Sequence, residues 1–169
     1  MELMKAIMGR RSVRQYDETK PVTDKDLKTI LTAAMYAPSA MNKRPWEFVV
    51  IRNKNVLEQI RQLHPHAGFI TEAGTAVAVC GNTEQAYGGY AAIDVALATQ
   101  NLMLATHDLG YGSCYCGTHS DEAWAEQIRQ WLNLPDNIEM YGLIVIGTPL
   151  KDKEVPERFE ENKIHYNVW

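Results

Sequence analysis

Apolar residues recur at intervals of three and four positions over five stretches of the chain. These stretches cover residues 2–9, 23–37, 53–63, 89–110 and 120–132. This spacing puts the apolar side chains on one face of a helix, so we expect a helix over each stretch. Thr23 and Asn53 stand where N-cap residues are expected. The cap and the acidic first turn of the last helix are predicted at Ser120, Asp121 and Glu122.

Residues 89–110 form the longest of these patterns. The pattern opens at Gly88 and Gly89, carries many alanines and ends at Gly110. About twenty residues at 1.5 Å each span roughly 30 Å, the width of a small domain, so we expect the central helix here. Its small side chains would let another backbone approach, from this chain or from a second copy. Asp94 is expected to find a partner, since a buried lone carboxylate is costly.

Three short apolar runs predict β-strands at residues 47–51, 75–81 and 142–147. The run at 75–81 lacks polar alternation, which is typical of a central strand covered on both faces. Cys80 within this run is expected to be a small core residue. Residues 112–118 form a segment bounded by glycines. Loops are expected at 38–46, which is bracketed by prolines, and at 64–68.

The composition is that of a globular protein, with 46% hydrophobic and 22% charged residues in a chain of 169. No linker or repeat divides the chain, so we expect one domain over residues 1–169. The formal net charge of −4 argues against a general nucleic-acid binder, which would carry a broad basic face. Charged and amide side chains interrupt the most apolar stretch, residues 91–109, and this argues against a membrane span.

The amino-terminal residues carry charges at Glu2, Lys5 and Arg10 and show no apolar signal run. We therefore expect a cytoplasmic protein. Its three cysteines are an odd number and are expected to be reduced thiols rather than a disulfide framework.

Positive charge gathers at residues 10–14, against the acidic balance of the whole chain. Arg10, Arg11 and Arg14 surround Ser12, directly after the first predicted helix. Guanidinium groups bind phosphate oxygens two at a time and a hydroxyl adds a donor, so this cluster is a candidate phosphate site. The other interpretation is a solvated basic turn at the negative end of a helix. The spacing alone leaves both interpretations open.

Two further groups of residues suggest metal ligands. His64 and His66 flank Pro65, but no second pair of ligands completes a site, so a plain surface turn is favoured. Cys114 and Cys116 are followed by His119, but the thiols are too few and too tightly spaced for a standard zinc set. We expect no metal.

Residues 155–169 are mostly polar but end on apolar and aromatic side chains, namely Ile164, Tyr166, Val168 and Trp169. Disordered tails rarely end in this way. We expect this tail to dock on another surface.

Several motifs follow one another in a fixed order. Residues 10–16 read Arg-Arg-Ser-Val-Arg-Gln-Tyr, and residues 37–46 read Ala-Pro-Ser-Ala-Met-Asn-Lys-Arg-Pro-Trp. The alanine-rich helix ends in Asp-Leu-Gly-Tyr-Gly at 108–112, Ser-Cys-Tyr-Cys-Gly follows at 113–117, and Ile-Gly-Thr-Pro stands at 146–149. At these separations the set resembles the nitroreductase family of FMN-dependent reductases, and the resemblance covers nearly the whole chain.

The resemblance implies an α+β fold with a central, mostly antiparallel sheet flanked by helices. It also implies an intertwined homodimer with FMN at the subunit interface. The residues implied to grip the FMN phosphate and ribityl chain are Arg10, Ser12 and Arg14, with Arg11 adjacent. The tail residue implied to return to the phosphate is Arg158, with Lys163 as a competing candidate.

The flavin ring is implied to lie between the two subunits. The residues implied to pack on it from the other subunit are Pro38, Ser39 and Ala40, with Asn42 in the same loop. The residues implied to present backbone N–H groups near the flavin N5 edge are Cys116, Gly117 and Thr118.

The chemistry that the resemblance implies belongs to the cofactor. NADH or NADPH would deliver a hydride to flavin N5 and leave, and a flat, electron-poor oxidant such as a nitroaromatic or a quinone would take its place, which predicts ping-pong kinetics. No catalytic acid or base is expected. The chain has no Gly-x-Gly-x-x-Gly fingerprint, so the nicotinamide donor rests on the resemblance alone. The alternative is an FMN-binding carrier or redox sensor with little turnover.

The chain departs from the family pattern in the loop at 38–46. Met41 stands where the family has glycine, which removes a permissive backbone position. Arg44 stands where the family has glutamine, and it would favour anionic substrates if it reaches the slot over the flavin; the other interpretation is that it faces solvent. The chain is also short for the family and lacks the insertions that form substrate lids.

Overall fold

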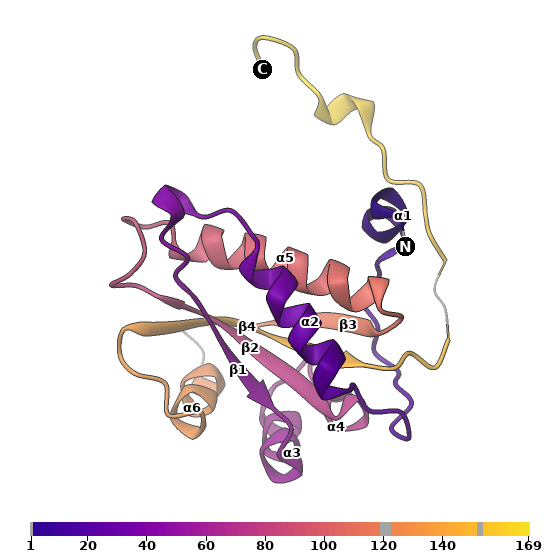
Figure 1. The fold of residues 1–169 in the computed structure, drawn as a ribbon, viewed down its shortest axis with the longest axis vertical. Coiled ribbons are helices and arrows are strands. Elements are labelled where there is room, and N and C mark those ends of the chain that lie inside the picture. Colours follow the sequence, from indigo (N-terminus) through magenta and orange to yellow (C-terminus); the bar gives the residue numbers. More distant parts are fainter. Residues whose placement is uncertain (1, 119–122, 152–153) are drawn as a thin grey trace.

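A four-stranded antiparallel sheet lies between two layers of helices in the computed structural model, which describes residues 2–118, 123–151 and 154–169 (Figure 1). The strands are β1 (Trp46–Ile51), β2 (Thr75–Asn82), β3 (Gly112–Gly117) and β4 (Ile138–Gly147). Their order across the sheet is β1-β2-β4-β3, so β1 and β3 are the edges. This arrangement confirms the α+β fold class.

The helices form one layer on each face of the sheet (Figure 1). One layer holds α2 (Asp24–Met35) and α5 (Ala91–Asp108), with α1 (Leu3–Gly9) beside α5. The other layer holds α3 (Lys54–Leu63), α4 (Ile70–Ala73) and α6 (Ala123–Trp131). Strand β2 is buried on both faces and contributes side chains to two separate cores, as its unbroken apolar pattern predicts. Two 3₁₀ turns, η1 (Ala40–Asn42) and η2 (Glu161–Lys163), complete the elements.

Most helix boundaries follow the caps predicted from the sequence. The Thr23 hydroxyl accepts a hydrogen bond from the Asp26 N–H at 3.1 Å, and the Asn53 side chain accepts one from the Asn55 N–H at 2.9 Å. Helix α2 ends at Met35, slightly before the predicted end. The predicted cap and acidic turn of the last helix, Ser120, Asp121 and Glu122, lie outside the described residues.

The sheet is larger than the apolar runs predict. Residues 112–117, expected only as a segment between glycines, form the edge strand β3. Strand β4 begins at Ile138 instead of residue 142, because Ile138 and Met140 point into the core while Glu139 faces solvent. The short helix α4 was not expected at all.

Helix α5 is the central helix, as predicted. It packs on α2 and on the sheet, and Ala98 and Leu102 are fully buried at these contacts. Asp94 is buried, and its Oδ1 accepts a hydrogen bond from the Ala40 N–H at 2.9 Å. This confirms the expected partner of Asp94. Its Oδ2 has no hydrogen-bond partner among the described residues.

The tail leaves the body of the molecule beside α1 and extends away from it (Figure 1). Its apolar side chains Ile164, Tyr166, Val168 and Trp169 are exposed, and Trp169 is 99% exposed. The tail was expected to dock on another surface. In the structure it docks on no surface of the described part of its own chain. Among the described helices, none is both long enough and apolar enough to cross a bilayer.

Candidate functional site

The arginine segment, residues 10–14, lies along the outer edge of β3. Ser12 and Ser113 form a parallel β-bridge, and the Val13 N–H donates a hydrogen bond to the Ser113 carbonyl at 2.9 Å. The Val13 side chain packs directly over Gly112, where an added Cβ would lie 2.6 Å from its nearest atom. Glycine at this position allows the segment to approach the strand.

Gly112→Ala is expected to push Val13 and the arginine segment away from β3. We expect the free energy of unfolding to fall by about 1–3 kcal/mol, the usual cost of overpacking. Urea unfolding measures this. The control is Gly89→Ala, since an added Cβ at Gly89 meets no atom within 4 Å. Equal stabilities of the two variants would contradict the close contact of Val13 with the strand.

The arginines of this segment have different surroundings. Burial and the neighbouring Arg11 and Arg158 guanidinium groups lower the pKa of Arg10. The Arg11 guanidinium donates to the Met8 and Arg10 carbonyls, each at 2.7 Å, and to the Glu154 carbonyl at 3.2 Å. Arg11 thus ties the start of the tail to the segment.

Two cations of the segment are left for an external anion. Within the described residues, neither Arg10 nor Arg14 makes an ion pair or a side-chain hydrogen bond. Arg10 and Arg158 come from distant parts of the chain, yet they lie close enough for their charges to repel. Such a pair is stabilised by a shared anion, and a phosphate group matches the guanidinium geometry.

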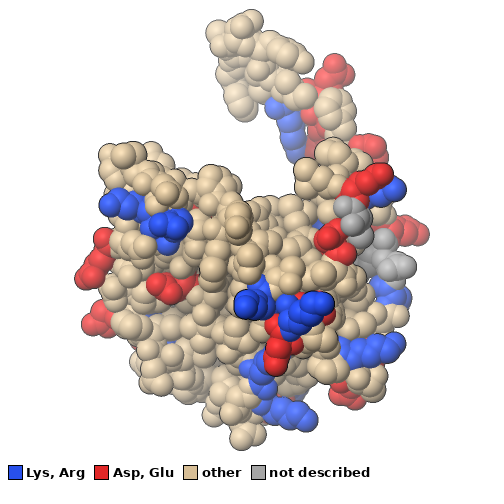
Figure 2. Space-filling view, viewed as in Figure 1, with Lys and Arg blue, Asp and Glu red and all other residues tan. Residues whose placement is uncertain are grey.

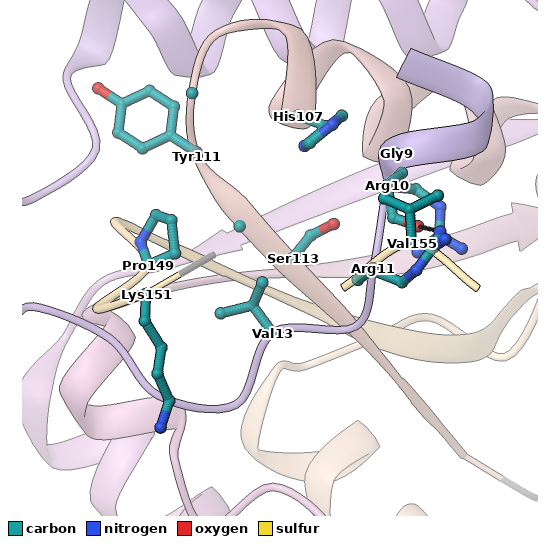
Figure 3. A pocket seen from close by; sticks show the side chains of 12 residues that line it. Gly9, Arg10, Arg11, Val13, His107, Tyr111, Ser113, Pro149, Lys151 and Val155 are labelled. Carbon is teal, nitrogen blue, oxygen red and sulfur yellow. Dashed lines mark hydrogen bonds between the residues drawn. The ribbon is translucent and has the colours of Figure 1, made fainter. Parts of the chain in front are cut away.

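A cavity of about 340 Å³ opens beside Arg10 and Arg11 (Figure 3). The side chains at its wall include those of Arg10, Arg11, His107, Tyr111, Ser113 and Lys151. Figure 3 shows Ser113 between His107 and Val13, with the two arginines to one side. Ser113 is 2% exposed, and its hydroxyl has no partner among the described residues. A buried hydroxyl of this kind needs a hydrogen-bond partner, and the surrounding cations favour an anionic one.

The outer edge of β3 also presents backbone donors that have no hydrogen-bond partner among the described residues. N–H and C=O groups alternate in direction along a strand, and the Ser113 carbonyl points outward to Val13. The backbone groups of Tyr115 and Gly117 therefore also point outward, while those of Cys114 and Cys116 point to β4. Of the three residues predicted to present N–H groups, Gly117 has its N–H on the open edge. Thr118 anchors the strand end, because its hydroxyl donates to the Met140 carbonyl at 3.0 Å.

A second cavity, of about 370 Å³, lies between this edge and the loop after α3. Arg14, Cys114 and Tyr115 line one side, and Pro65, His66, Gly68 and Phe69 line the other. The loop residues were not among the predicted site residues. The sequence near residue 66 does not predict this contact, because the loop and β3 are distant in the chain and come together only when it folds.

The three thiols are buried, and the pKa values of two of them are raised. A hydrogen bond with Cys114 and burial raise the pKa of Cys116, and burial raises the pKa of Cys80 to about 12. Cys80 is the core residue that the sequence predicted. His119 lies outside the described residues, and the part of the chain that is described holds no cluster of three or more histidine, cysteine or acidic side chains placed to bind a metal.

The loop at 38–46 has a strained backbone. Met41, Asn42 and Arg44 all adopt the left-handed conformation, with φ of 51°, 54° and 51°. Met41 thus takes up the conformation that a glycine would adopt at lower cost. Such strain persists where the surroundings fix the backbone. Here the Asp94 carboxylate holds the Ala40 N–H, and the Ser39 hydroxyl accepts from the Arg44 N–H at 2.9 Å.

This loop and the arginine segment lie toward opposite ends of α5. Ala40 is held by Asp94, near the helix start, whereas His107, near the helix end, lies against Gly9. The two helix positions are separated by roughly 20 Å at 1.5 Å per residue. Pro38, Ser39, Ala40 and Asn42 are therefore not brought together with Arg10 in one chain.

Comparison with known proteins gives a consistent result. The sequence model of the nitroreductase family matches residues 7–77 and 65–148. A protein of Methanothermobacter thermautotrophicus, provisionally described as an NADH dehydrogenase/NAD(P)H nitroreductase, is 34% identical over 170 residues. That alignment covers 100% of this chain and 88% of the relative.

Solved structures are also similar. A protein of Bacteroides thetaiotaomicron with the same provisional description superposes with a TM-score of 0.93 at 33% identity, over 99% of this chain and 98% of the other. An FMN-dependent nitroreductase of Clostridium difficile superposes with a TM-score of 0.89 at 27% identity, over 98% and 99%.

Proposed function

The chain belongs to the nitroreductase family and is an oxidoreductase, and we propose that it passes two electrons from NADH or NADPH through bound FMN to a flat, electron-poor acceptor such as a nitroaromatic or a quinone. The observation that carries the proposal is the meeting of Arg10, Arg11 and Arg158 with no carboxylate among the described residues to neutralise Arg10. The buried Ser113 hydroxyl, which has no partner in the described part of the chain, adds a polar group at the same cavity. These residues fit the phosphate of FMN.

Specific residues would hold the cofactor. Arg10, Ser12 and Arg158 would bind the phosphate and the ribityl chain, and Arg14 would face the ring end through the cavity that it lines. Lys163 is the weaker candidate for the phosphate, since its amine pairs with Glu160 at 2.7 Å. FMN bound there would supply the hydride and electron transfer.

The protein would contribute position and charge. The outward N–H groups of Tyr115 and Gly117 would donate to acceptor atoms at the edge of the ring. Donors and cations beside the ring stabilise negative charge that develops on it during reduction. The buried thiols take no part in this proposal.

We further propose that the active form is a homodimer in which the loop at 38–42 of one copy completes the flavin site of the other. Helix α1 and α5 expose apolar side chains, among them Leu3, Met4, Ile7, Ile93 and Leu97. Figure 2 shows that the surface beneath the tail, over α5, carries few charged residues. Exposed apolar surface with few charges is typical of a protein interface. The distance of Ala40 from Arg10 within one chain agrees with this arrangement.

Residues 1–169 would act as one domain in each copy of this dimer. The cytoplasmic location stays a prediction from the sequence.

Purified protein tests the proposal. It should be yellow, or take up added FMN in a one-to-one ratio, and NADH or NADPH should bleach the flavin rapidly in a stopped-flow experiment. A quinone added afterwards should restore the oxidised spectrum. Binding of FMN with slow or absent reduction would instead support a carrier or sensor. A colourless protein that takes up no FMN would refute the proposal.

A further inference from the structure

His64 is buried, although the sequence favours a plain surface turn at this position. It is 2% exposed at the end of α3, so the prediction of a surface turn is wrong for His64, although Pro65 and His66 are exposed. The physical reason is a partner far away in the sequence. The loop after α3 folds against the outer edge of β3, and His64 fills the contact.

Both ring nitrogens of His64 have hydrogen-bond partners. The His66 N–H donates to Nδ1 at 3.1 Å, so Nδ1 carries no proton. Nε2 lies 3.1 Å from the Gly117 carbonyl, which only accepts, so Nε2 carries the proton and donates it. These two bonds define one neutral tautomer. Burial lowers the pKa of His64, which also favours the neutral ring.

The ring of His64 is fixed by packing as well. Its centroid lies 4.3 Å from that of the Trp124 ring, at an interplanar angle of 50°. Trp124 belongs to α6, so His64 joins the end of α3, the helix α6 and the end of β3. The direction of its Nε2–H toward Gly117 is therefore set by three elements.

The bond to Gly117 attaches the loop after α3 to the outer edge of β3. The Gly117 carbonyl and the Gly117 N–H point to the same side of the strand, and this side also borders the cavity lined by Arg14 and His66. A weaker contact lies beside it, since the Cys116 thiol donates to the His66 carbonyl at 3.6 Å. The loop is thus attached to the end of the strand at two points, through the Gly117 carbonyl and the Cys116 thiol.

We propose that His64 is a positioning residue for the flavin site: through its bond to the Gly117 carbonyl it holds the end of β3 and its outward N–H groups at the distance that the ring edge requires. His64 lines neither cavity and acts through Gly117. The role at the flavin rests on the proposed function, whereas the role in holding the strand does not.

Three variants separate the two bonds of His64. In His64→Gln the side-chain N–H₂ reaches the position of Nε2 and keeps the donor to Gly117. In His64→Asn the side-chain oxygen reaches the position of Nδ1 and keeps the acceptor for the His66 N–H, but it loses the donor to Gly117. His64→Leu keeps apolar bulk against Trp124 and loses both bonds.

We expect His64→Asn and His64→Leu to bind FMN about tenfold more weakly than the wild type, which corresponds to the loss of one hydrogen bond. Their flavin midpoint potential should be more negative, because a displaced edge donor stabilises the reduced ring less. His64→Gln should stay close to the wild type in both measurements. Amide hydrogen exchange of Cys116 and Thr118 in the flavin-free protein should be faster in His64→Asn than in His64→Gln.

The outcomes are distinguishable. Equal exchange rates in His64→Asn and His64→Gln would overturn the proposal whether or not the protein binds FMN. An unchanged affinity and potential in His64→Asn, in a wild type that binds FMN, would overturn the role at the flavin. A wild type that binds no FMN would refute the proposed function and with it that role, while the exchange rates would still decide whether His64 holds the strand.

Discussion

Arg10→Gln is expected to weaken FMN binding by about tenfold to a hundredfold, the effect of losing charge-assisted hydrogen bonds to a phosphate. The fold should remain intact. Burial and, to a smaller extent, the neighbouring guanidinium groups of Arg11 and Arg158 lower the pKa of Arg10, so its positive charge is disfavoured in the folded protein and its removal relieves this cost. The thermal midpoint of the flavin-free variant should therefore equal or exceed that of the wild type.

Flavin fluorescence titration at two salt concentrations measures this effect. The wild type should lose affinity more steeply with salt than Arg10→Gln, because one fewer cation contacts the phosphate. Arg61→Gln is the matched control, since Arg61 pairs with Glu58 on the surface of α3 at 2.6 Å. FMN affinity in Arg10→Gln equal to that of the control would remove Arg10 from the phosphate site.

Removal of residues 164–169 is expected to dissociate the proposed dimer, because we expect the tail, which docks on no described surface of its own chain, to dock on the second copy. The deletion takes away Ile164, Tyr166, Val168 and Trp169, which are exposed in the single chain, and it retains Arg158. Burial of one large apolar side chain contributes about 1.5–3 kcal/mol, so loss of four should raise the dissociation constant by at least a thousandfold. FMN should be lost together with the dimer, because the loop of the partner would no longer cover the ring.

Sedimentation velocity over a range of concentrations, with absorbance read at the flavin band, follows both losses at once. Asn162→Ser is the control, since it changes an exposed polar residue of the tail and should leave the dimer intact. A wild type that sediments as a monomer at all concentrations would contradict the dimer. A dimer of unchanged affinity after the deletion would show that the tail does not hold it.

The sequence predicted those helices and strands that are determined by residues adjacent in the chain. The caps at Thr23 and Asn53, the alanine-rich α5 and the buried strand β2 each follow from a few neighbouring residues. Strand β3 did not, because Ser113 and Tyr115 break its apolar pattern, and its place in the sheet comes from pairing with β4.

The candidate site, too, could be predicted only where its residues are neighbours in the chain. The clustering of Arg10, Arg11 and Arg14 is visible in the sequence, and in the structure Arg10 and Arg11 line one cavity and Arg14 lines another. The role of Arg11 in tying down the tail and the engagement of His64 with Gly117 depend on residues 143 and 53 positions away. No short-range pattern contains such contacts.

The buried thiols have a consequence for the conditions in which the protein can work. Reduced flavins in open sites react with dioxygen and release hydrogen peroxide, which oxidises the thiolate form of cysteine. The high pKa values of Cys80 and Cys116 keep both sulfurs protonated, and their burial keeps peroxide away. In a flavoenzyme built in this way, Cys80 and Cys116 would resist oxidation by the by-product of the enzyme's own turnover in air.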